Sequence, residues 1–305
     1  MPRIRHSFDE RSWACYRLRP MRSNVIRPSA LFRLFNFGIG VAIFLYVFEL
    51  RADVYDNGPP DHVNGLDMGN RIQADDFEVT EGSRFDGVKF WDFEGAGSFA
   101  GSVTWQLYKN TDSNMPGDLI ASGVSIDLSH TETGFVSFIF REAVNEFVVP
   151  PMYLRPGAYW LGLHNGSLDN TSELKVFWAN TANHGTPNNG TRPSYWQFAP
   201  YVGAWNSNYY IMYPDFLSEF AFQIKGVPAP KITNCTMTGG SPRIRFTTAL
   251  GETYRVVYKN DLREAAWLAL AGSESIAGTG NVLEVTDPDP SAKDLRQRYY
   301  RVEML

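Results

Sequence analysis

The sequence predicts an all-β protein made of a larger β-sandwich and a smaller one, behind an N-terminal export signal. Three observations lead to this prediction. Short strand patterns recur between turn residues from residue 53 onward, no amphipathic helical stripe of comparable length appears, and a proline-rich segment near residue 228 divides the pattern in two. Hydrophobic residues make up 44% of the chain, which is enough to build packed cores.

The N-terminus has the order of a secretory signal. Arg22, Arg27 and Arg33 precede an uncharged, mostly apolar run over residues 34–48, and the small residue Ala52 follows shortly after it. Basic residues stay on the cytoplasmic side, the apolar run enters the export machinery, and a small residue fits the signal peptidase. We therefore expect residues 1–52 to be a signal peptide and the protein to be secreted or extracytoplasmic, in the periplasm or at the cell surface.

A retained membrane anchor is the alternative for this segment, and it is the only membrane contact that the sequence alone leads us to expect. The apolar run has 15 residues, whereas a helix needs about 17 to 25 to span a bilayer. Arg51, unusual beside a cleavage site, keeps the alternative open. Met21 is an alternative start, because export signals rarely follow a preface containing Asp9 and Glu10.

Charge and cysteine content narrow the possible functions. Removing residues 1–52 leaves 19 basic and 30 acidic residues, a net charge near −11. Such a surface repels nucleic acid, which proteins bind through clustered Lys and Arg. The processed chain keeps one cysteine, Cys235, so it could form no internal disulfide, and we expect this cysteine to be structural rather than nucleophilic.

The first domain is predicted to span residues 53–226 as a β-sandwich or jelly roll. Residues 103–108 show the alternation of a half-buried strand, with Trp105 and Leu107 on one face and Thr104 and Gln106 on the other. The strongest strand patterns cover residues 76–80, 87–93, 103–108, 134–140, 159–164, 174–179 and 220–225. Regular short strands of this kind are typical of sandwiches.

A stiff linker is predicted at residues 227–230, because Pro228 and Pro230 favour extended backbone and cannot donate ladder hydrogen bonds. The second domain, residues 231–305, contains about seven strand patterns. This number and length suit an immunoglobulin-like or fibronectin-type sandwich. Its clearest strand patterns cover residues 243–247, 254–258, 282–286 and 298–302.

An ordered set of short motifs resembles a secreted β-sandwich module of environmental bacteria. The motifs lie at residues 54–59, 73–77, 90–91, 116–123, 156–161 and 220–222. The tail resembles the immunoglobulin-like module that ends many exported surface proteins of similar bacteria, through residues 254–258, 261–262, 267, 278–280, 286–288 and 299–302. Many proteins with this tail module end in a sorting or anchoring signal, and this chain departs from that pattern, because only Glu303, Met304 and Leu305 follow Val302. We therefore expect release from the cell or noncovalent association. Neither resemblance supplies a catalytic residue.

Patterns that would predict an enzyme are weak. No G-x-S-x-G nucleophile motif occurs, and the scattered histidines lack the spacing of a zinc site. His164 ends an apolar strand, where we expect a structural hydrogen bond. Asp92 and Glu94 share one strand face, as a glycosidase pair could, but two such carboxylates are more often a solvated face.

Clustered acidic residues predict a structural calcium site, since calcium prefers oxygen ligands. The candidate ligands are Asp53, Asp56, Asp61, Asp75 and Asp76. Neighbouring first and last strands would add Asp215 or Glu219. Aspartates are also common in surface turns for purely conformational reasons, so the cluster has a second explanation. No other cofactor is expected.

Aromatic and amide residues interleave over residues 177–213, which predicts a carbohydrate site beside a polar surface loop at residues 180–193. Flat rings cover the C–H face of a sugar while amides hydrogen-bond its hydroxyls. The candidate ligand-binding residues are Trp178, Tyr195, Trp196, Tyr201, Trp205, Asn206 and Tyr209. The alternative is that these rings fill the sandwich core. Trp178, Trp196 and Trp205 are the tryptophans that we expect to be exposed.

These patterns favour a secreted, noncatalytic binding module for carbohydrate or another cell-surface polymer, with the smaller domain as a spacer or protein contact. Two alternatives stay open. One is an architectural protein of a surface layer or matrix, and the other is an extracellular hydrolase whose site is assembled from residues far apart in the sequence.

Overall fold

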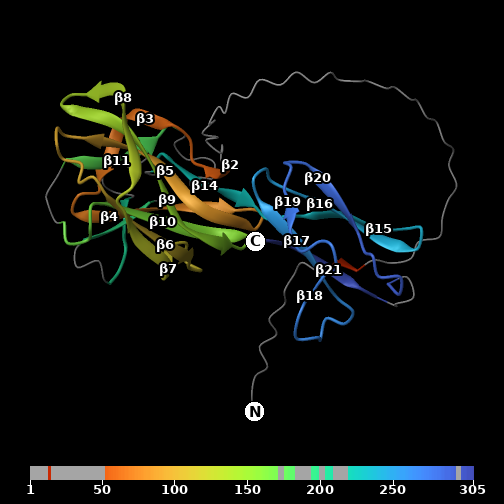
Figure 1. Ribbon diagram of the computed structural model, residues 1–305. Coiled ribbons are helices and arrows are strands. Elements are labelled where there is room, and N and C mark those ends of the chain that lie inside the picture. Colours follow the sequence, from red (N-terminus) through yellow and green to blue (C-terminus); the bar gives the residue numbers. More distant parts are fainter. Residues whose placement is uncertain are drawn as a thin grey trace, which may run out of the picture. The chain divides into compact units, whose positions relative to one another are not determined.

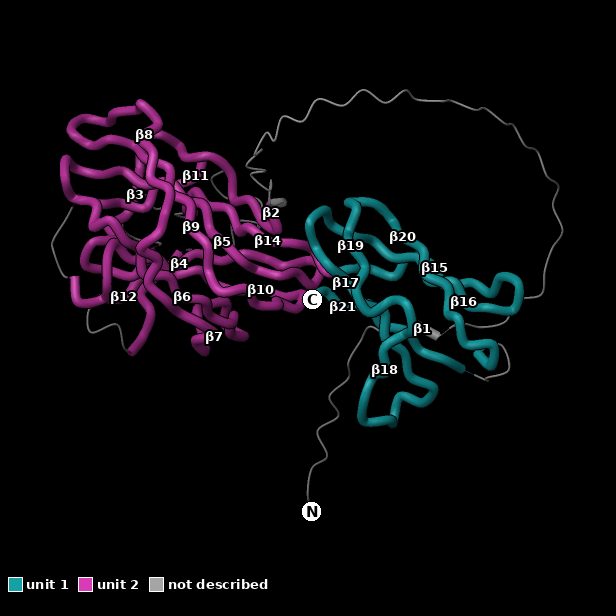
Figure 2. The backbone as a smooth tube through the Cα atoms, viewed as in Figure 1, with its two compact units in different colours: residues 1–50, 230–305 teal, residues 51–229 magenta. Residues whose placement is uncertain are grey.

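The computed structural model describes residues 13–14, 52–170, 175–182, 194–198, 203–208, 219–292 and 297–305. These residues form strands and turns throughout (Figure 1), which confirms the all-β prediction. The chain divides into two compact units (Figure 2): Arg51–Ala229, and Pro230–Leu305 together with a short N-terminal strand. Among the described residues, no helix has the length and hydropathy needed to cross a membrane.

The larger unit contains a six-stranded antiparallel sheet in the order β13-β12-β4-β10-β6-β7. Its strands are β4 (Arg71–Val79), β6 (Val103–Asn110), β7 (Pro116–Ser125), β10 (Gly157–Asn165), β12 (Tyr195–Phe198) and β13 (Asn206–Ser207). The sheet therefore brings the expected aromatic segment, on β12 and β13, beside the acidic strand β4.

A seven-stranded sheet forms the other layer of this unit. Its strands are β2 (Ala52–Asp56), β3 (Pro60–Asp67), β5 (Ser83–Glu94), β8 (Leu128–Ser137), β9 (Phe140–Leu154), β11 (Val176–Thr181) and β14 (Phe222–Pro228). The central strand β5 pairs with β14 and β11 on one side and with β9 on the other, and β9 also pairs with β8.

The main core lies between the two sheets and follows the alternation of the strands. Trp105 and Leu107 belong to it, as the pattern of residues 103–108 predicted. Phe77, Leu161 and Phe222 enter it from three other strands. A second, smaller cluster lies on the opposite face of the six-stranded sheet and is described below.

One predicted strand, over residues 134–140, is wrong in detail. These residues form the end of β8, a tight turn at Phe138 and Ile139, and the start of β9, because Ser137 pairs with Phe140. Neither turn residue is a usual turn former. The long strand β9 also includes two consecutive prolines at positions 150 and 151, where the pairing with β5 shifts register between Phe85 and Gly87.

The smaller unit is built from a three-stranded and a five-stranded sheet around its own core, which includes Phe246, Tyr254 and Tyr300. The first sheet contains β15 (Ile232–Thr238), β16 (Ser241–Thr247) and β20 (Val282–Thr286). The second contains β1 (Trp13–Ala14), β17 (Thr253–Lys259), β18 (Leu268–Ala269), β19 (Ile276–Ala277) and β21 (Tyr299–Met304).

Two features at the start of this unit differ from the sequence analysis. Val227 and Pro228, expected in the linker, belong to β14, where they pair with Arg84 and Ser83. Cys235 is disulfide-bonded in the full chain, and the other cysteine in the sequence, Cys15, lies outside the described residues. The expectation that Cys235 forms no internal disulfide is therefore not met in the full chain.

Candidate functional site

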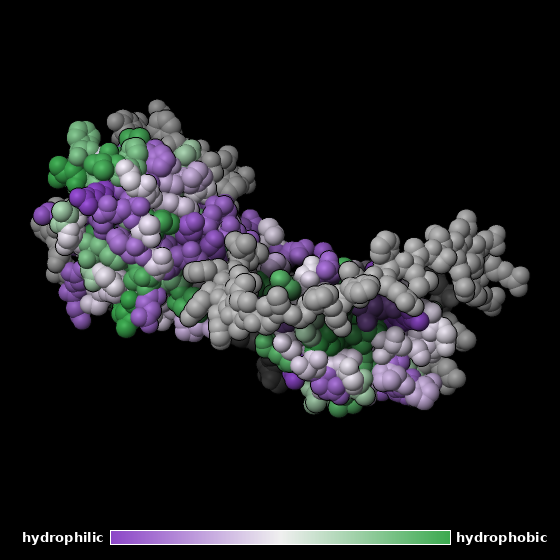
Figure 3. All heavy atoms as spheres, turned by 45° about the horizontal axis from the view of Figure 1, so that its top comes forward, coloured by the Kyte–Doolittle hydropathy of each residue, from purple (hydrophilic) through white to green (hydrophobic). Residues whose placement is uncertain are grey.

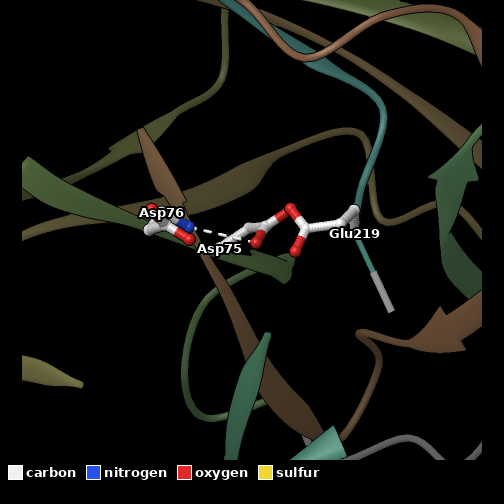
Figure 4. A group of neighbouring side chains, drawn as sticks. All are labelled: Asp75, Asp76 and Glu219. Carbon is white, nitrogen blue, oxygen red and sulfur yellow. Dashed lines mark hydrogen bonds between the residues drawn. The ribbon is translucent and has the colours of Figure 1, made fainter. Parts of the chain in front are cut away.

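Three buried carboxylates meet in the larger unit, and we call them the acidic triad. Asp75 and Asp76 come from β4, and Glu219 lies shortly before β14, 143 residues after Asp76 in the sequence. In Figure 4 the side chains of Asp75 and Glu219 point toward each other, and Asp76 lies on the other side of Asp75. One ligand atom from each residue lies within 4.8 Å of the other two. Oxygen ligands at this spacing suit a hard cation such as calcium.

Hydrogen bonds fix Asp75 at the centre of the triad. Its Oδ1 accepts from the backbone N–H of Asp76 at 3.0 Å, and its Oδ2 accepts from the backbone N–H of Phe220 at 2.6 Å. Nδ2 of Asn57 lies 3.4 Å from the same Oδ2 and also donates to the Phe220 carbonyl at 2.8 Å. These contacts join β4 to the chain segments beside it.

The electrostatics of the acidic triad are unfavourable for three ionised carboxylates. Burial raises the pKa of Asp75 well above its usual range, and the carboxylates of Glu219 and Asp76 raise it further. The two backbone donors lower the pKa and so favour the ionised form. A proton or a bound cation would relieve this repulsion.

Of the five calcium ligands expected from the sequence, the structure brings together Asp75 and Asp76, with Glu219 added as anticipated. The other three have different partners. Asp53 pairs with Lys225 at 2.5 Å, Asp56 accepts from Gly58 and Gln223, and Asp61 accepts from the backbone of Val63 and Asn64. Asp215 lies outside the described residues.

Trp178 is a core residue, so the expectation that its ring is exposed is not met. Its ring is fully buried, stacks on Phe220 with 4.5 Å between ring centroids, and contacts Phe90 and Phe222 edge-on. Its Nε1–H donates to the Ala221 carbonyl at 3.1 Å. The alternation along β11 turns this side chain inward, although a polar segment follows it in the sequence.

Tyr195 and Trp205 join an aromatic cluster on the outward face of the six-stranded sheet. Tyr195 meets Trp160 edge-on at 5.3 Å between centroids, and Trp205 meets Tyr108 in the same way at 5.2 Å. Trp160 is fully buried and donates its Nε1–H to Oδ1 of Asn110. The cluster is a covered aromatic layer with a half-exposed Trp205 at its margin.

Trp196 faces the opposite side of the same sheet and belongs to a surface that we call the β12 patch: Arg71, Trp196, Phe198 and Asn206. The register places Arg71 opposite Phe198 and Trp196 opposite Asn206, so all four lie on one face of β4, β12 and β13. The Arg71 guanidinium lies 4.9 Å from the centroid of the Trp196 ring and 4.5 Å from that of Phe198.

The β12 patch combines exposed rings with hydrogen-bonding groups. Phe198 is 46% exposed, Asn206 is exposed, and Arg71 and Trp196 are half-buried. Nε of Arg71 and Nε1 of Trp196 are buried atoms without a hydrogen-bond partner among the described residues, so they are not the donors that the surface of the patch presents. Tyr201 and Tyr209, the remaining aromatic candidates, lie outside the residues that the structure describes.

Asp92 and Glu94 lie on one face of β5, as alternation predicted, but Asp92 is fully buried rather than solvated. Across the strands, Nε2 of His130 lies 3.4 Å from Oε1 of Glu94, and its Nδ1 lies 2.8 Å from Oδ1 of Asn145. Burial raises the pKa of Asp92, and Glu94 raises it further, while the nearby Asn145 amide lowers it. Neither Asp92 oxygen has a well-formed hydrogen bond in the described part of the chain.

His164 is buried at the end of β10, where its Nδ1 lies 3.5 Å from the Gly166 carbonyl oxygen. Burial lowers the pKa of this imidazole, and the contact with Gly166 raises it. This position fits the structural role expected for a strand-end histidine.

Sequence reasoning missed Arg71 and Phe198 in the β12 patch and His130 and Asn145 beside Asp92. The pairing of β12 with β4 is the signal that was needed, because it places Arg71 against the aromatic strand. The fold and these sites define an all-β protein with two sandwich units, a buried acidic triad and a surface with aromatic and guanidinium groups. No protein-family model and no curated protein matches the chain.

Proposed function

We propose that the protein is a secreted, noncatalytic binding module and that the β12 patch contacts carbohydrate on a polysaccharide or another cell-surface polymer. The single observation that carries this proposal is the shared face of Arg71, Trp196, Phe198 and Asn206, which joins accessible aromatic surface to polar groups. Carbohydrate sites divide their contacts in this way.

The geometry of the patch suits a sugar ring. Phe198 and the exposed part of the half-buried Trp196 would offer apolar contact to C–H groups, while the terminal amino groups of Arg71 and the Asn206 amide would offer hydrogen bonds to hydroxyls. Stacking on two rings holds the guanidinium in one orientation, which reduces the entropy lost when a ligand binds.

Two substitutions in the patch test the proposal: Trp196→Ala and Arg71→Gln. Both should abolish retardation of the protein in gels that contain a soluble glycan, while the melting temperature changes little. Trp91→Ala is the matched control, because Trp91 is also half-buried, with Nζ of Lys89 4.9 Å from its ring centroid, but lies on the other sheet. Equal retardation of wild type and both patch variants would show that the β12 patch does not bind the glycan.

For the acidic triad we propose a structural calcium ion. Asp75, Asp76 and Glu219 would supply its carboxylate ligands, and the charge of the ion would offset their repulsion. Such an ion would tie β4 to the segment before β14, so its contribution would be to the stability of the larger unit rather than to chemistry.

A further inference from the structure

The hairpin that joins β8 to β9 ends in an exposed apolar tip, which we define as Phe135, Val136, Phe138 and Ile139. The exposed fractions of these residues are 38%, 57%, 97% and 76%. Figure 3 shows hydrophobic residues gathered at the end of the larger unit that carries β8. Soluble monomers rarely present several large apolar side chains together without a binding role.

The backbone of the tip is strained. Phe138 has a φ of +55° in the two-residue turn between Ser137 and Phe140. Glycine or asparagine normally occupies such a position, because a large side chain there costs conformational energy. A phenylalanine at this turn stabilises neither the hairpin nor the core, so the exposed ring itself is the feature that calls for an explanation.

The base of the hairpin is held firmly. Thr133 donates to Oε1 of the buried Glu142 at 2.8 Å, and Oε2 of the same carboxylate lies 2.7 Å from Nδ1 of His62. The Phe135 ring packs against His62 with 4.8 Å between ring centroids. The tip is therefore presented on a fixed support rather than on a loose loop.

The charges around the tip suit an uncharged apolar phase. Residues 133–140 contain no charged side chain. The exposed charges that flank this segment in the sequence, Glu132 and Arg141, form an ion pair at 2.7 Å, and the Glu142 carboxylate at the base of the hairpin is buried. A second copy of this acidic chain would meet charge repulsion on approach, whereas a zwitterionic lipid surface would not.

We propose that the tip inserts Phe138 and Ile139 into the interfacial region of a phospholipid membrane and so docks the protein peripherally. The ion pair at the base of the tip would remain among the headgroups, while the two side chains leave water. This docking is separate from the β12 patch and does not depend on glycan binding.

A tryptophan placed at the tip tests the insertion directly. In the processed chain, residues 53–305, with Phe138→Trp, phosphatidylcholine vesicles with brominated acyl chains should quench the added fluorescence, measured as the difference from wild type. Leu250→Trp, at a 76% exposed position in the smaller unit, is the matched control and should not be quenched. Absence of quenching at position 138 would overturn the proposal.

A second variant separates binding from folding. Phe138→Gly with Ile139→Ser relieves the positive φ and removes both side chains, so its melting temperature should equal or exceed that of wild type. The apparent vesicle affinity of the processed protein should fall by at least about tenfold. Unchanged vesicle affinity would contradict insertion. A concentration-dependent dimer that forms without vesicles and is lost in this variant would also overturn it, in favour of contact between copies.

Discussion

Replacing Trp178 by alanine should destabilise the larger unit strongly, because the indole is fully buried. Large-to-small changes of buried tryptophan cost about 3–5 kcal/mol. The ring contacts three phenylalanines, and its N–H satisfies the buried carbonyl of Ala221, so the loss should lie near the upper end of that range. In a unit of this size each kcal/mol lowers the melting temperature by about 2–4 °C, which predicts a decrease of about 8–20 °C.

Trp196→Ala provides the comparison for this prediction. Trp196 is half-buried at the β12 patch rather than enclosed in the core, so we expect a loss of about 1 kcal/mol or less. Chemical denaturation followed by circular dichroism measures both free energies of unfolding. The comparison holds when both variants keep the same m-value, the slope of the unfolding free energy against denaturant concentration. Similar losses in the two variants, or a larger loss for Trp196, would refute the assignment of one ring to the core and the other to the surface.

Three further predictions concern ions, pH and processing. Chelation should lower the melting temperature of wild type, because an ion bound by the native state stabilises it, and should leave the melting temperature of Asp76→Asn unchanged. Identical melting curves of wild type in calcium and in chelator would contradict the calcium site. The raised pKa of Asp92 means that the folded state holds its proton to higher pH than the unfolded state, so this group lowers stability as pH rises above about 4. The melting temperature of Asp92→Asn minus that of wild type should therefore increase as pH rises from 4 to neutrality. A difference in melting temperature that does not depend on pH would exclude this effect. If the N-terminal signal is cleaved as predicted, the chain should begin at Asp53. An intact mass that includes residues 1–52 would contradict this prediction.

Local patterns in the sequence predicted most strands because one face of each sheet packs on the core. The alternation of Trp105 and Leu107 is an example, and these two side chains enter the main core. The turn at Phe138 was missed because the residues around it look like one continuous strand. Residues 134–140 have the composition of a strand, and no glycine, asparagine or proline marks the position where the chain reverses.

The site residues depended on pairings that a single sequence does not reveal. Trp196 and Trp205 are nine positions apart, yet they face opposite sides of the six-stranded sheet, so they cannot form one platform. Trp178 borders a polar segment, but its strand turns it inward. Glu219 meets Asp75 because the segment before β14 lies beside β4, a contact between distant parts of the chain.

Binding of a glycan by the processed protein is the most direct test of the proposed function. Labelled protein spanning residues 53–305 should bind at least one carbohydrate on an array of bacterial, plant and algal glycans, and that binding should be lost with Trp196→Ala and kept with Trp91→Ala. A wild-type protein that is folded, as shown by its cooperative melting, and that binds no glycan on the array would contradict the proposal and favour an architectural role.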